Sequence, residues 1–550
     1  MPEYLSPGVY VEELSGPKPI EGVGTSTGAF VGIAERGPIN SAQLITNLTQ
    51  FTDTFGGFLP KAHLAYAVQH FFTEGGTRCF VVRAFKPSAA PSGGDPTPDL
   101  ARVNMMGGSP PANVMQVRAA SVGAWGNSIS VRAGKPGFDP NETNPATTKK
   151  FKLEVFYKSD PAPVEVFDGL SMAEFDGATG LPNPNHVEMR INGVSKYITV
   201  VDASTNPAQI DPPTFLNTST PLTLGTDGLP AGSAQSTNML PADLIGSVSS
   251  ASTPASGLHA FDTIEEINIV AIPELVNPAF AQADARSATL AGFGYCELRK
   301  DCFFVADTPQ GMSPLGALGY KRGVAPDGTN LGSAFNSKYG ALYYPWIYAT
   351  DPLTGKRKLL PPSGAVAGSY SASDVRVGVH KAPAGIDDGY LNSAVDVERV
   401  LTKGEHDVLN PEGVNAIRKF ADAGVVIWGA RTVSADSEWK YINVRRLFIF
   451  LESSLLKGTQ GVVFEPNDRS LWKRIERDVG AFLRVQWREG KLVGDKPEKA
   501  FFVKCDEETN PPESVDLGRV ITLIGVAPSK PAEFVIFRIR QTRSGGGAEE

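Results

Sequence analysis

The stretch that decides the fold runs from Ala29 to Ala34 and reads AFVGIA. A short apolar run of this kind is typical of a buried strand. Further along, apolar residues recur at the spacing of one helix face, namely Leu64, Ala67, Val68, Phe71 and Phe72. Gly75 and Gly76 provide a helix stop, and CFVVRAF at 79–85 predicts a second buried strand. Strand, helix and strand in this order predict a partly parallel sheet.

Between residues 89 and 245 the helical period disappears. Residues 86–113 are rich in Pro, Gly, Ser and Asp, and short alternating runs come after them, at 114–118, 129–132, 151–157 and 197–201. Alternation with a period of two is the pattern of half-buried strands. We therefore predict an inserted β-rich domain with exposed loops.

The α/β pattern returns near residue 257. Apolar strands are predicted at 267–273, 303–307 and 341–348. Two long helices follow in the last block: Val444, Leu447, Phe448, Leu451 and Leu455 form the apolar face of the first, and Leu471, Ile475, Val479, Phe482 and Leu483 that of the second. Asn467 is the predicted N-cap of the second helix and Gly490 its stop. Strands at 501–503 and 520–526 complete the block.

The bulk composition excludes several classes of protein. The chain has 550 residues, too many for one ordinary core, and a formal net charge of -8. A nucleic-acid binder needs a strong basic footprint, which this balance does not favour. The N-terminus has no secretory signal pattern, and no apolar run is long enough to span a membrane. We therefore expect a protein that folds in the cytoplasm, binds no nucleic acid and does not insert into a membrane.

The four cysteines, Cys79, Cys296, Cys302 and Cys505, show no C-x-x-C pair. Neither a disulfide framework nor a zinc site is indicated. We expect buried thiols in a reducing compartment.

Both ends of the chain carry an isolated strand pattern. Residues 8–13 read GVYVEE and precede a Pro-rich connector, and residues 533–540 read EFVIFRIR and follow a second one at 528–531. A lone strand is unstable in water, so each must pair with a sheet, either in this chain or in a neighbour. Residues 544–550 form a Gly-rich acidic tail with the composition of a disordered segment.

One glycine-rich segment near the start suggests two kinds of chemistry. Residues 22–28 read GVGTSTG, but a dinucleotide loop needs a strand before it and a helix after it, and here a Pro-rich linker precedes and a strand follows. The sequence contains no G-x-x-x-x-G-K-[ST] motif, so an ATP-driven motor is not predicted. Ser26 lies in a Gly-Thr-Ser context close to the nucleophile segment of subtilisin-like proteases.

A protease would also need a histidine base and a carboxylate. The six histidines are His63, His70, His186, His259, His380 and His406, and none has the His-Gly-Thr context of those enzymes. His259 with Asp262 is the best candidate base, yet Ser26 lies near the start of the chain, where that family has its serine near the end. We predict no enzyme, with no catalytic, cofactor-binding or metal-binding residue.

The second long helix is basic. It carries Lys473, Arg474, Arg477, Arg484 and Arg488, together with Trp472 and Trp487. Such a run is usually a solvated face, but arginine and tryptophan are also typical of interface anchors. The helix is the favoured internal candidate for contact with an acidic partner.

Several stretches together resemble the contractile tail sheath family of phages, R-type bacteriocins and extracellular contractile injection systems. The opening YLSPGVYVEE at 4–13 and the segment PPSGAVAG at 361–368 carry most of the likeness. Shorter matches lie at 29–32, 71–83, 224–228, 267–273, 381–384, 429–432 and 441–446. The region 89–245 carries little of it, as expected for a variable insertion.

The resemblance implies a mixed α/β, multi-domain fold with a subtilisin-like α/β core that lacks the catalytic triad. The expected divisions are an N-terminal strand arm at 1–21, a first core segment at 22–88, the β-rich insertion at 89–245, a second core segment at 246–395, a C-terminal α+β domain with tube-facing helices at 396–527, and a strand arm with a tail at 528–550.

The resemblance also implies a structural role in assembly. Six subunits would form a ring around an inner tube, and rings would stack helically with baseplate and terminator proteins at the ends. Strand exchange between subunits would use Val9, Tyr10, Val11 and Glu12 at one end and Phe534, Val535, Ile536, Phe537 and Ile539 at the other. Lys473, Arg474, Arg477, Arg484 and Arg488 would face the tube. A baseplate signal would trigger contraction and drive the tube through a target envelope.

Two other classes of protein stay open at this point: a degenerate hydrolase and another self-assembling shell protein. A type VI secretion sheath is a related alternative, but it is built from two shorter chains. The particle would assemble in the cytoplasm and leave by lysis or a dedicated route. Neither the kind of machine nor its target follows from the residues.

Overall fold

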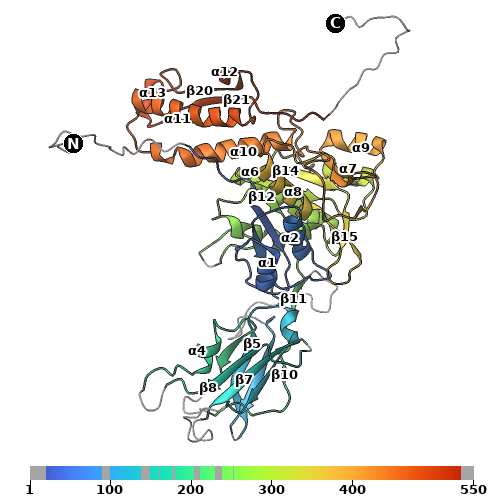
Figure 1. Ribbon diagram of the computed structural model, residues 1–550, viewed down its shortest axis with the longest axis vertical. Helices are drawn as coiled ribbons and strands as arrows, with labels where there is room; N and C mark the ends of the chain where they lie inside the picture. Colours follow the sequence, from blue (N-terminus) through green and yellow to red (C-terminus); the bar gives the residue numbers. More distant parts are fainter. Residues whose placement is uncertain are drawn as a thin grey trace, which may run out of the picture. The chain divides into compact units, whose positions relative to one another are not determined.

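The computed structural model describes residues 20–88, 99–108, 110–137, 149–158, 160–175, 180–203, 211–229, 238–251 and 253–533. The chain divides into two compact units. The C-terminal unit comprises the described residues 20–24, 373–382 and 437–533, and the central unit those within 25–372 and 383–436. Both units mix helices and strands, which confirms the predicted mixed α/β class (Figure 1).

The central unit is built on an eight-stranded sheet with the order β19-β18-β14-β13-β12-β1-β3-β2. Its six inner strands pair in parallel, and the two outermost pairings, β18 with β19 and β2 with β3, are antiparallel. The predicted partly parallel sheet is therefore confirmed. The strands are β1 (Gly28–Gly32), β2 (Gln43–Ile45), β3 (Cys79–Arg83), β12 (Ile269–Ala271), β13 (Phe303–Asp307), β14 (Gly340–Tyr344), β18 (Val414–Phe420) and β19 (Gly424–Ile427).

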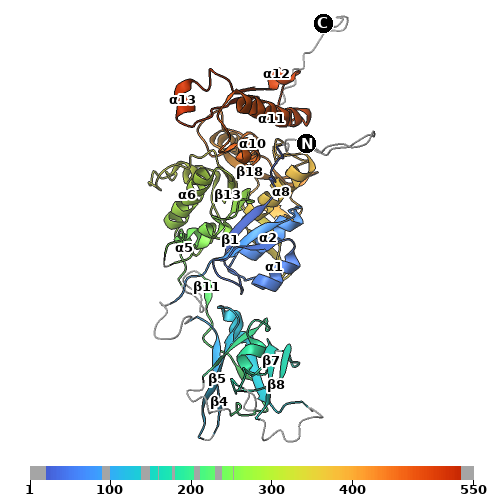
Figure 2. The ribbon, with the colours of Figure 1, turned by 90° about the vertical axis from the view of Figure 1, so that its left-hand side faces the viewer.

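Helices cover both faces of this sheet because neighbouring residues of a strand point to opposite sides. Phe303 packs on Tyr370 of α8, whereas Phe304 packs on Phe293 of α6. Figure 2 shows α6 on one side of the sheet and α2 with α8 on the other. The helices of this unit are α1 (Leu48–Phe55), α2 (Leu64–Thr73), α5 (Pro241–Ile245), α6 (Gln282–Arg299), α7 (Pro314–Arg322), α8 (Ser363–Arg376), whose last residues belong to the C-terminal unit, and α9 (Lys403–Leu409).

The insertion is β-rich, as predicted. A sheet with the order β4-β5-β9 and one with the order β10-β6-β7-β8 share one apolar core, to which Met115, Val131 and Val155 belong. The elements are β4 (Arg102–Gly107), β5 (Ala112–Ala119), β6 (Ile129–Gly134), β7 (Phe151–Tyr157), β8 (Glu165–Leu170), α4 (Val187–Ile191), β9 (Ile198–Asp202), β10 (Thr220–Pro221) and β11 (Asp227–Leu229).

The predicted strand at 341–348 is wrong, because the run divides at Pro345, which has no N–H to donate to a ladder. Its first half is β14, and its second half is β15 (Ile347–Thr350). β15 lies between β16 (Arg357–Leu360) and β17 (Asp396–Val397) in a separate antiparallel sheet.

The C-terminal unit contains the two long helices that the sequence predicts. α10 (Ile442–Gly458) and α11 (Arg469–Arg488) share one apolar cluster with the hairpin of β20 (Phe501–Lys504) and β21 (Leu523–Val526). The short helices α12 (Pro497–Ala500) and α13 (Pro512–Asp516) complete the unit. The N-cap of α11 is Asp468, whose side chain accepts from Leu471 N, whereas Asn467, the predicted cap, accepts from Trp472 Nε1.

The four cysteines are free and buried, as expected. Within the described ranges no helix has both the length and the apolar character needed to cross a membrane. The same residues contain no cluster of three or more His, Cys, Asp or Glu side chains suited to a metal ion.

Candidate functional site

Helix α10 holds the segment through which the chain enters the described structure. A Cβ built on Gly458 would lie 2.6 Å from Cγ2 of Ile20, so only glycine allows this contact. Val23 N donates to Ser454 Oγ at 3.1 Å, one helical turn earlier. Residues 20–24 therefore run along α10 from its C-terminal end towards its middle. Sequence reasoning missed both anchors, although a Ser and a Gly four residues apart on one helix face offered a signal.

The same helix holds the chain near its other end. Asn443 Nδ2 donates to the carbonyl oxygens of Ser529, at 3.0 Å, and of His380, at 2.7 Å. Glu533 accepts from Tyr441 Oη at 3.3 Å and pairs with Lys440 at 3.6 Å. Ser529 N also donates to the carbonyl of Lys491. The connector at 528–531 is thus fastened within the C-terminal unit.

A buried ion pair fixes α10 against the last turns of α8. Arg446 donates to both carboxylate oxygens of Asp374, at 2.9 and 2.6 Å. The two side chains are 3% and 1% exposed. Such a bidentate pair is strongly directional, so it sets the orientation of α10 as well as its position.

The β20–β21 hairpin is a two-stranded sheet with open edges. Four residue pairs, from Phe501↔Val526 to Lys504↔Leu523, hold it together, and no third strand of the described chain joins the sheet. Just past β21, Val493 N donates to the carbonyl of Ala527, and Pro528 forms an isolated antiparallel bridge with Leu492. Phe502 is 53% exposed and Leu523 is 52% exposed. A two-stranded sheet with open edges offers main-chain groups and apolar surface to another strand.

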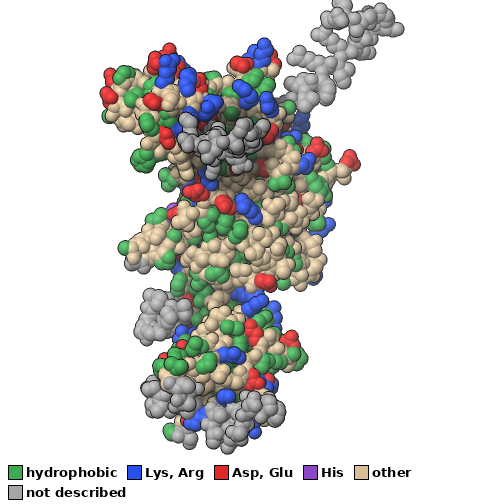
Figure 3. Space-filling view, turned by 60° about the vertical axis from the view of Figure 1, so that its left-hand side comes forward, with side chains coloured by type: hydrophobic (Ala, Val, Ile, Leu, Met, Phe, Trp, Pro, Cys, Tyr) green, Lys and Arg blue, Asp and Glu red, His purple; other side chains and the backbone are tan. Residues whose placement is uncertain are grey.

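The predicted basic side chains lie on α11, in two groups. Lys473, Arg477, Arg484 and Arg488 recur at i, i+4, i+11 and i+15, which places them in one stripe opposite the buried Ile475, Val479 and Phe482. Arg474 lies outside the stripe and pairs with Glu465 at 3.5 Å. Lys473 pairs with Glu476 and Arg477 with Asp478, while Arg484 and Arg488 have no acidic partner within 4.0 Å among the residues that the structure describes. Figure 3 shows blue and red side chains side by side over this unit.

The predicted strand-exchange residues lie outside the described residues. They are Val9, Tyr10, Val11 and Glu12 at one end and Phe534, Val535, Ile536, Phe537 and Ile539 at the other. The structure describes the two points from which those segments leave, at residue 20 and residue 533.

The hydrolase-like residues form one pair, and the described residues show no triad. His259 Nδ1 lies 3.1 Å from Asp262 Oδ2, as the sequence suggested. Ser26 is engaged through its carbonyl, which accepts from Ser371 Oγ at 2.9 Å. No hydrogen bond between Ser26 and His259 occurs in the described chain.

At the carboxyl edge of the parallel strands, where α/β sheets usually carry their ligand sites, two buried carboxylates hold helix N-termini. Glu274, just after β12, accepts from the backbone N–H groups of His63 and Leu64 at the start of α2. Asp307, the last residue of β13, accepts from Ser363 N at the start of α8 at 2.8 Å. Burial raises the pKa of Asp307 to about 7. Both carboxylates therefore have structural partners.

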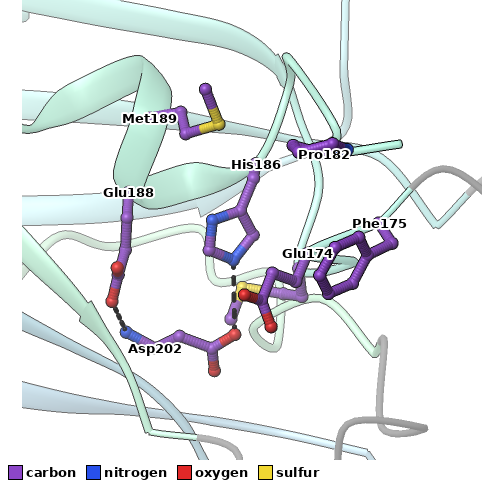
Figure 4. Close-up of a pocket in the computed structure, with 8 residues that line it drawn as sticks. Glu174, Phe175, Pro182, His186, Glu188, Met189 and Asp202 are labelled. Atoms are coloured by element: carbon purple, nitrogen blue, oxygen red, sulfur yellow. Dashed lines mark hydrogen bonds and ion pairs between the residues drawn. The ribbon is translucent and has the colours of Figure 1, made fainter. Parts of the chain in front are cut away.

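A cavity of about 450 Å³ lies in the insertion and is lined by Met172, Glu174, Phe175, Pro182, His186, Glu188, Met189 and Asp202. His186 Nε2 lies 3.4 Å from Asp202 Oδ2, and Glu188 accepts from the backbone N–H of Asp202 (Figure 4). Among the described residues, no serine, threonine, cysteine or lysine lines the cavity. The described lining therefore offers no hydroxyl, thiol or amine nucleophile beside the histidine.

Comparisons with known proteins match this chain in two adjoining regions. Residues 251–433 match the family model described as the phage tail sheath protein central domain, and residues 434–542 match the phage tail sheath C-terminal domain. The tail sheath protein of Vibrio phage KVP40 is 26% identical over 250 residues, which cover 43% of this chain and 36% of the relative. The tail sheath protein of Enterobacteria phage T4 is 22% identical over 46% of this chain and 39% of its own. The chain thus spans little more than a third of the length of these relatives.

The helical sheath of the anti-feeding prophage, solved in its contracted state, has a similar fold. The TM-score is 0.55 at 21% identity, with 98% of this chain and 99% of that chain covered. At this identity the likeness concerns the fold alone.

The buried carboxyl of Asp307 predicts a pH-dependent stability. Its folded-state pKa of about 7 is raised above the ordinary value of 3.8, so the unfolded chain releases this proton first and stability falls as pH rises from 4 to 7. Asp307→Asn keeps an oxygen for Ser363 N and removes the ionisation. We expect the free energy of unfolding of the variant, relative to that of the wild type, to rise by about 2 kcal/mol between pH 5.5 and pH 8. Thermal unfolding at a series of pH values measures this difference. The exposed Asp53→Asn should track the wild type, and equal pH profiles for all three proteins would contradict the assignment.

Proposed function

The chain belongs to the contractile tail sheath family, and from this premise we propose that it is a structural sheath subunit. It polymerises as stacked hexameric rings around an inner tube, and contraction of the stack drives the tube through a target envelope. The observation that carries this proposal is the C-terminal unit, where one helix holds residues 20–23 and Ser529 in the same unit as a two-stranded hairpin.

The β20–β21 hairpin is the proposed acceptor of the strands that subunits exchange. A two-stranded sheet is marginally stable in water, and open edges invite another strand. The strands at 8–13 and 533–540 of neighbouring subunits would add to β20 and β21, with main-chain hydrogen bonds for affinity and Val9, Val11, Phe537 and Ile539 for register. The exposed Phe502 and Leu523 give those side chains an apolar surface to cover.

Helix α10 sets the geometry of this exchange. Asn443 and Gly458 are fifteen residues apart, so the two departure points lie about 22 Å apart along a rigid axis. Strands lent from one copy to the next form heterologous contacts, which generate rings or open helices. The spacing of the anchors would thus contribute to the spacing of the lattice.

Contraction needs no nucleotide in this scheme. Each Å² of apolar surface buried contributes about 25 cal/mol, so roughly 100 Å² more burial per subunit in the short form would contribute about 2.5 kcal/mol. Because the described chain is fastened through 528–533, rotation during contraction would be absorbed by the N-terminal connector at 16–19 and by the chain after residue 533.

The basic stripe of α11 is proposed to hold the subunit to an acidic tube surface. Arg484 and Arg488 are its strongest members, since neither has an acidic partner within the described ranges. Their charges are available to a partner, whereas those of Lys473 and Arg477 are shared with Glu476 and Asp478.

The expectations about the core layout, the divisions of the chain and the partners are part of the same proposal. The central unit would be the subtilisin-like α/β layout, used without catalysis because Glu274 and Asp307 serve helix ends. The six segments from 1–21 to 528–550 remain the proposed divisions of the chain. Within the proposed C-terminal domain, residues 396–436 belong to the compact central unit, whose sheet β18 and β19 extend. Partners would be further copies, the tube, the baseplate and the terminator, in a particle assembled in the cytoplasm.

Electron microscopy of the purified full-length protein tests the function. We expect long hollow cylinders with regular striations, because head-to-tail contacts propagate without closing on a dimer. Closed shells, flat lattices or a small species with esterase activity would each reject the proposal.

Deleting residues 1–14 tests strand exchange. The truncated chain keeps Ile20 to Gly24 on α10, so its C-terminal unit should still fold. We expect cylinders to be absent or reduced to single rings in micrographs, since the lent strand is gone. Sheaths of normal length from this variant would refute strand exchange while leaving the family assignment intact.

Reversing the free charges of the stripe tests the tube contact. Arg484→Glu with Arg488→Glu, introduced into cells that produce whole particles, should give sheaths without tubes, because two attractions become repulsions. The control is Lys496→Glu with Lys499→Glu, two exposed cations of the same unit outside the stripe, of which Lys499 pairs with Asp495 at 3.0 Å. Equal tube occupancy for the two double variants would dispose of the idea.

A further inference from the structure

Two of the four buried cysteines face each other inside the central unit. Cys296 belongs to the last turn of α6, and Cys302 directly precedes β13, the strand against which α6 packs (Figure 2). Their sulfur atoms are 3.4 Å apart, and both residues are 0% exposed. Among the described residues, neither Cys79 nor Cys505 has a hydrogen bond to another sulfur. The pair of thiols is thereby distinguished from the other two.

The turn that separates the two cysteines is braced. Lys300 has a φ of 67°, in the left-handed region, and its N–H donates to the carbonyl of Cys296 at 2.9 Å. Arg299 donates to both carboxylate oxygens of Asp301, at 2.9 and 2.7 Å. The same guanidinium donates to the carbonyl of Phe261 at 2.8 Å. Because a bidentate pair is strongly directional, these contacts keep the two sulfur atoms opposite each other.

The separation of the sulfur atoms suits a disulfide. An S–S bond is about 2.05 Å long, so the two atoms have to approach by about 1.4 Å. Rotation of the two side chains about their Cα–Cβ bonds supplies a movement of this size. The bond would close a ring across the turn at 297–301. It would join the end of α6 to an inner strand of the eight-stranded sheet.

Burial makes the reaction of this pair slow. The thiolate is the reactive form of cysteine, and the hydrogen bond to Cys296 together with burial raises the pKa of the Cys302 thiol. Oxidation therefore depends on local opening of the turn, which lies at the surface, since Leu298 is 84% exposed and Lys300 is exposed. A small oxidant such as hydrogen peroxide fits this route better than a bulky one.

We propose that Cys296 and Cys302 form a redox lock, which is open in a reducing compartment and closes as a disulfide when the subunit meets a peroxide. The thiolate of one cysteine attacks a peroxide oxygen, breaks the O–O bond and becomes a sulfenic acid. The second thiol attacks that sulfur, forms the S–S bond and displaces water. In sum, two thiols lose two electrons and two protons, and one hydrogen peroxide becomes two molecules of water.

The closed lock ties α6 to the sheet of the central unit. Only its timing rests on the proposed function, in which the particle assembles in the cytoplasm and is released later. A subunit would then assemble with both thiols reduced, and its body would be stiffened by the new bond after release.

Peptide mapping of the full-length protein tests the lock. The protein is purified with a reducing agent, freed of that agent and exposed in the folded state to hydrogen peroxide. Free thiols are then alkylated in denaturant, and the chain is digested with trypsin without reduction. Trypsin cuts after Arg286, Arg299, Lys300 and Lys321, so the disulfide joins peptide 287–299 to peptide 301–321.

We expect the linked peptides to account for most of Cys296 after oxidation, while Cys79 and Cys505 are recovered alkylated. The link should be absent from Cys302→Ser and present in Cys505→Ala, which leaves the pair intact. The oxidised wild type should unfold about 2 °C above the reduced protein, since the bond restricts the unfolded chain. The matched control, Cys302→Ser, should show no such rise.

Three results would overturn the lock. They are recovery of both peptides in alkylated form only, a link from either peptide to Cys79 or Cys505, and an unfolding temperature that the link leaves unchanged. Cylinder formation is scored in the same samples by electron microscopy. Linked protein that forms no cylinders would count against the sheath function and for the lock, so the two failures give different results.

Discussion

The hold of helix α10 on the first described residues, 20–23, and on Ser529 near the last is the constraint on which the rest depends. Its last turn admits Ile20 only because residue 458 is glycine, and its first turn fastens the other end through the amide of Asn443. The buried pair of Arg446 with Asp374 fixes the helix itself. A subunit whose terminal strands pair with neighbouring subunits needs fixed points from which those strands leave. Without such points the direction of an exchanged strand is undetermined.

In the central unit, acidic side chains at the carboxyl edge of the parallel strands hold the starts of two helices. In sheets of this type the carboxyl ends of parallel strands usually present reactive groups to a ligand. Here Glu274 and Asp307 occupy those ends and accept hydrogen bonds from the first N–H groups of α2 and α8. These hydrogen bonds tie the starts of α2 and α8 to the edge of the sheet, which suits a rigid body that moves as a whole.

Much of the fold could be predicted from local pattern. The strands at 29–34 and 79–85 and the helix that begins at Leu64 follow from apolar runs and helical spacing, and the structure confirms them. Errors arose where one residue decides a boundary. Pro345 divides a run that looks continuous, and Asp468 caps α11 in place of its neighbour Asn467, because both side chains can accept but only one meets Leu471 N. The exchange residues at the two ends stay predictions.

The sequence by itself determined the family, the α/β alternation, the β-rich insertion and the basic character of α11, because these depend on the order and periodicity of side chains. Only the tertiary structure decided which residues anchor the chain ends. Ser454, Gly458 and Asn443 gain their roles from contacts with residues more than sixty positions away, and no local pattern records such a contact. The same holds for the fastening of residues 528–533, which depends on Asn443 and Tyr441 far away in the sequence.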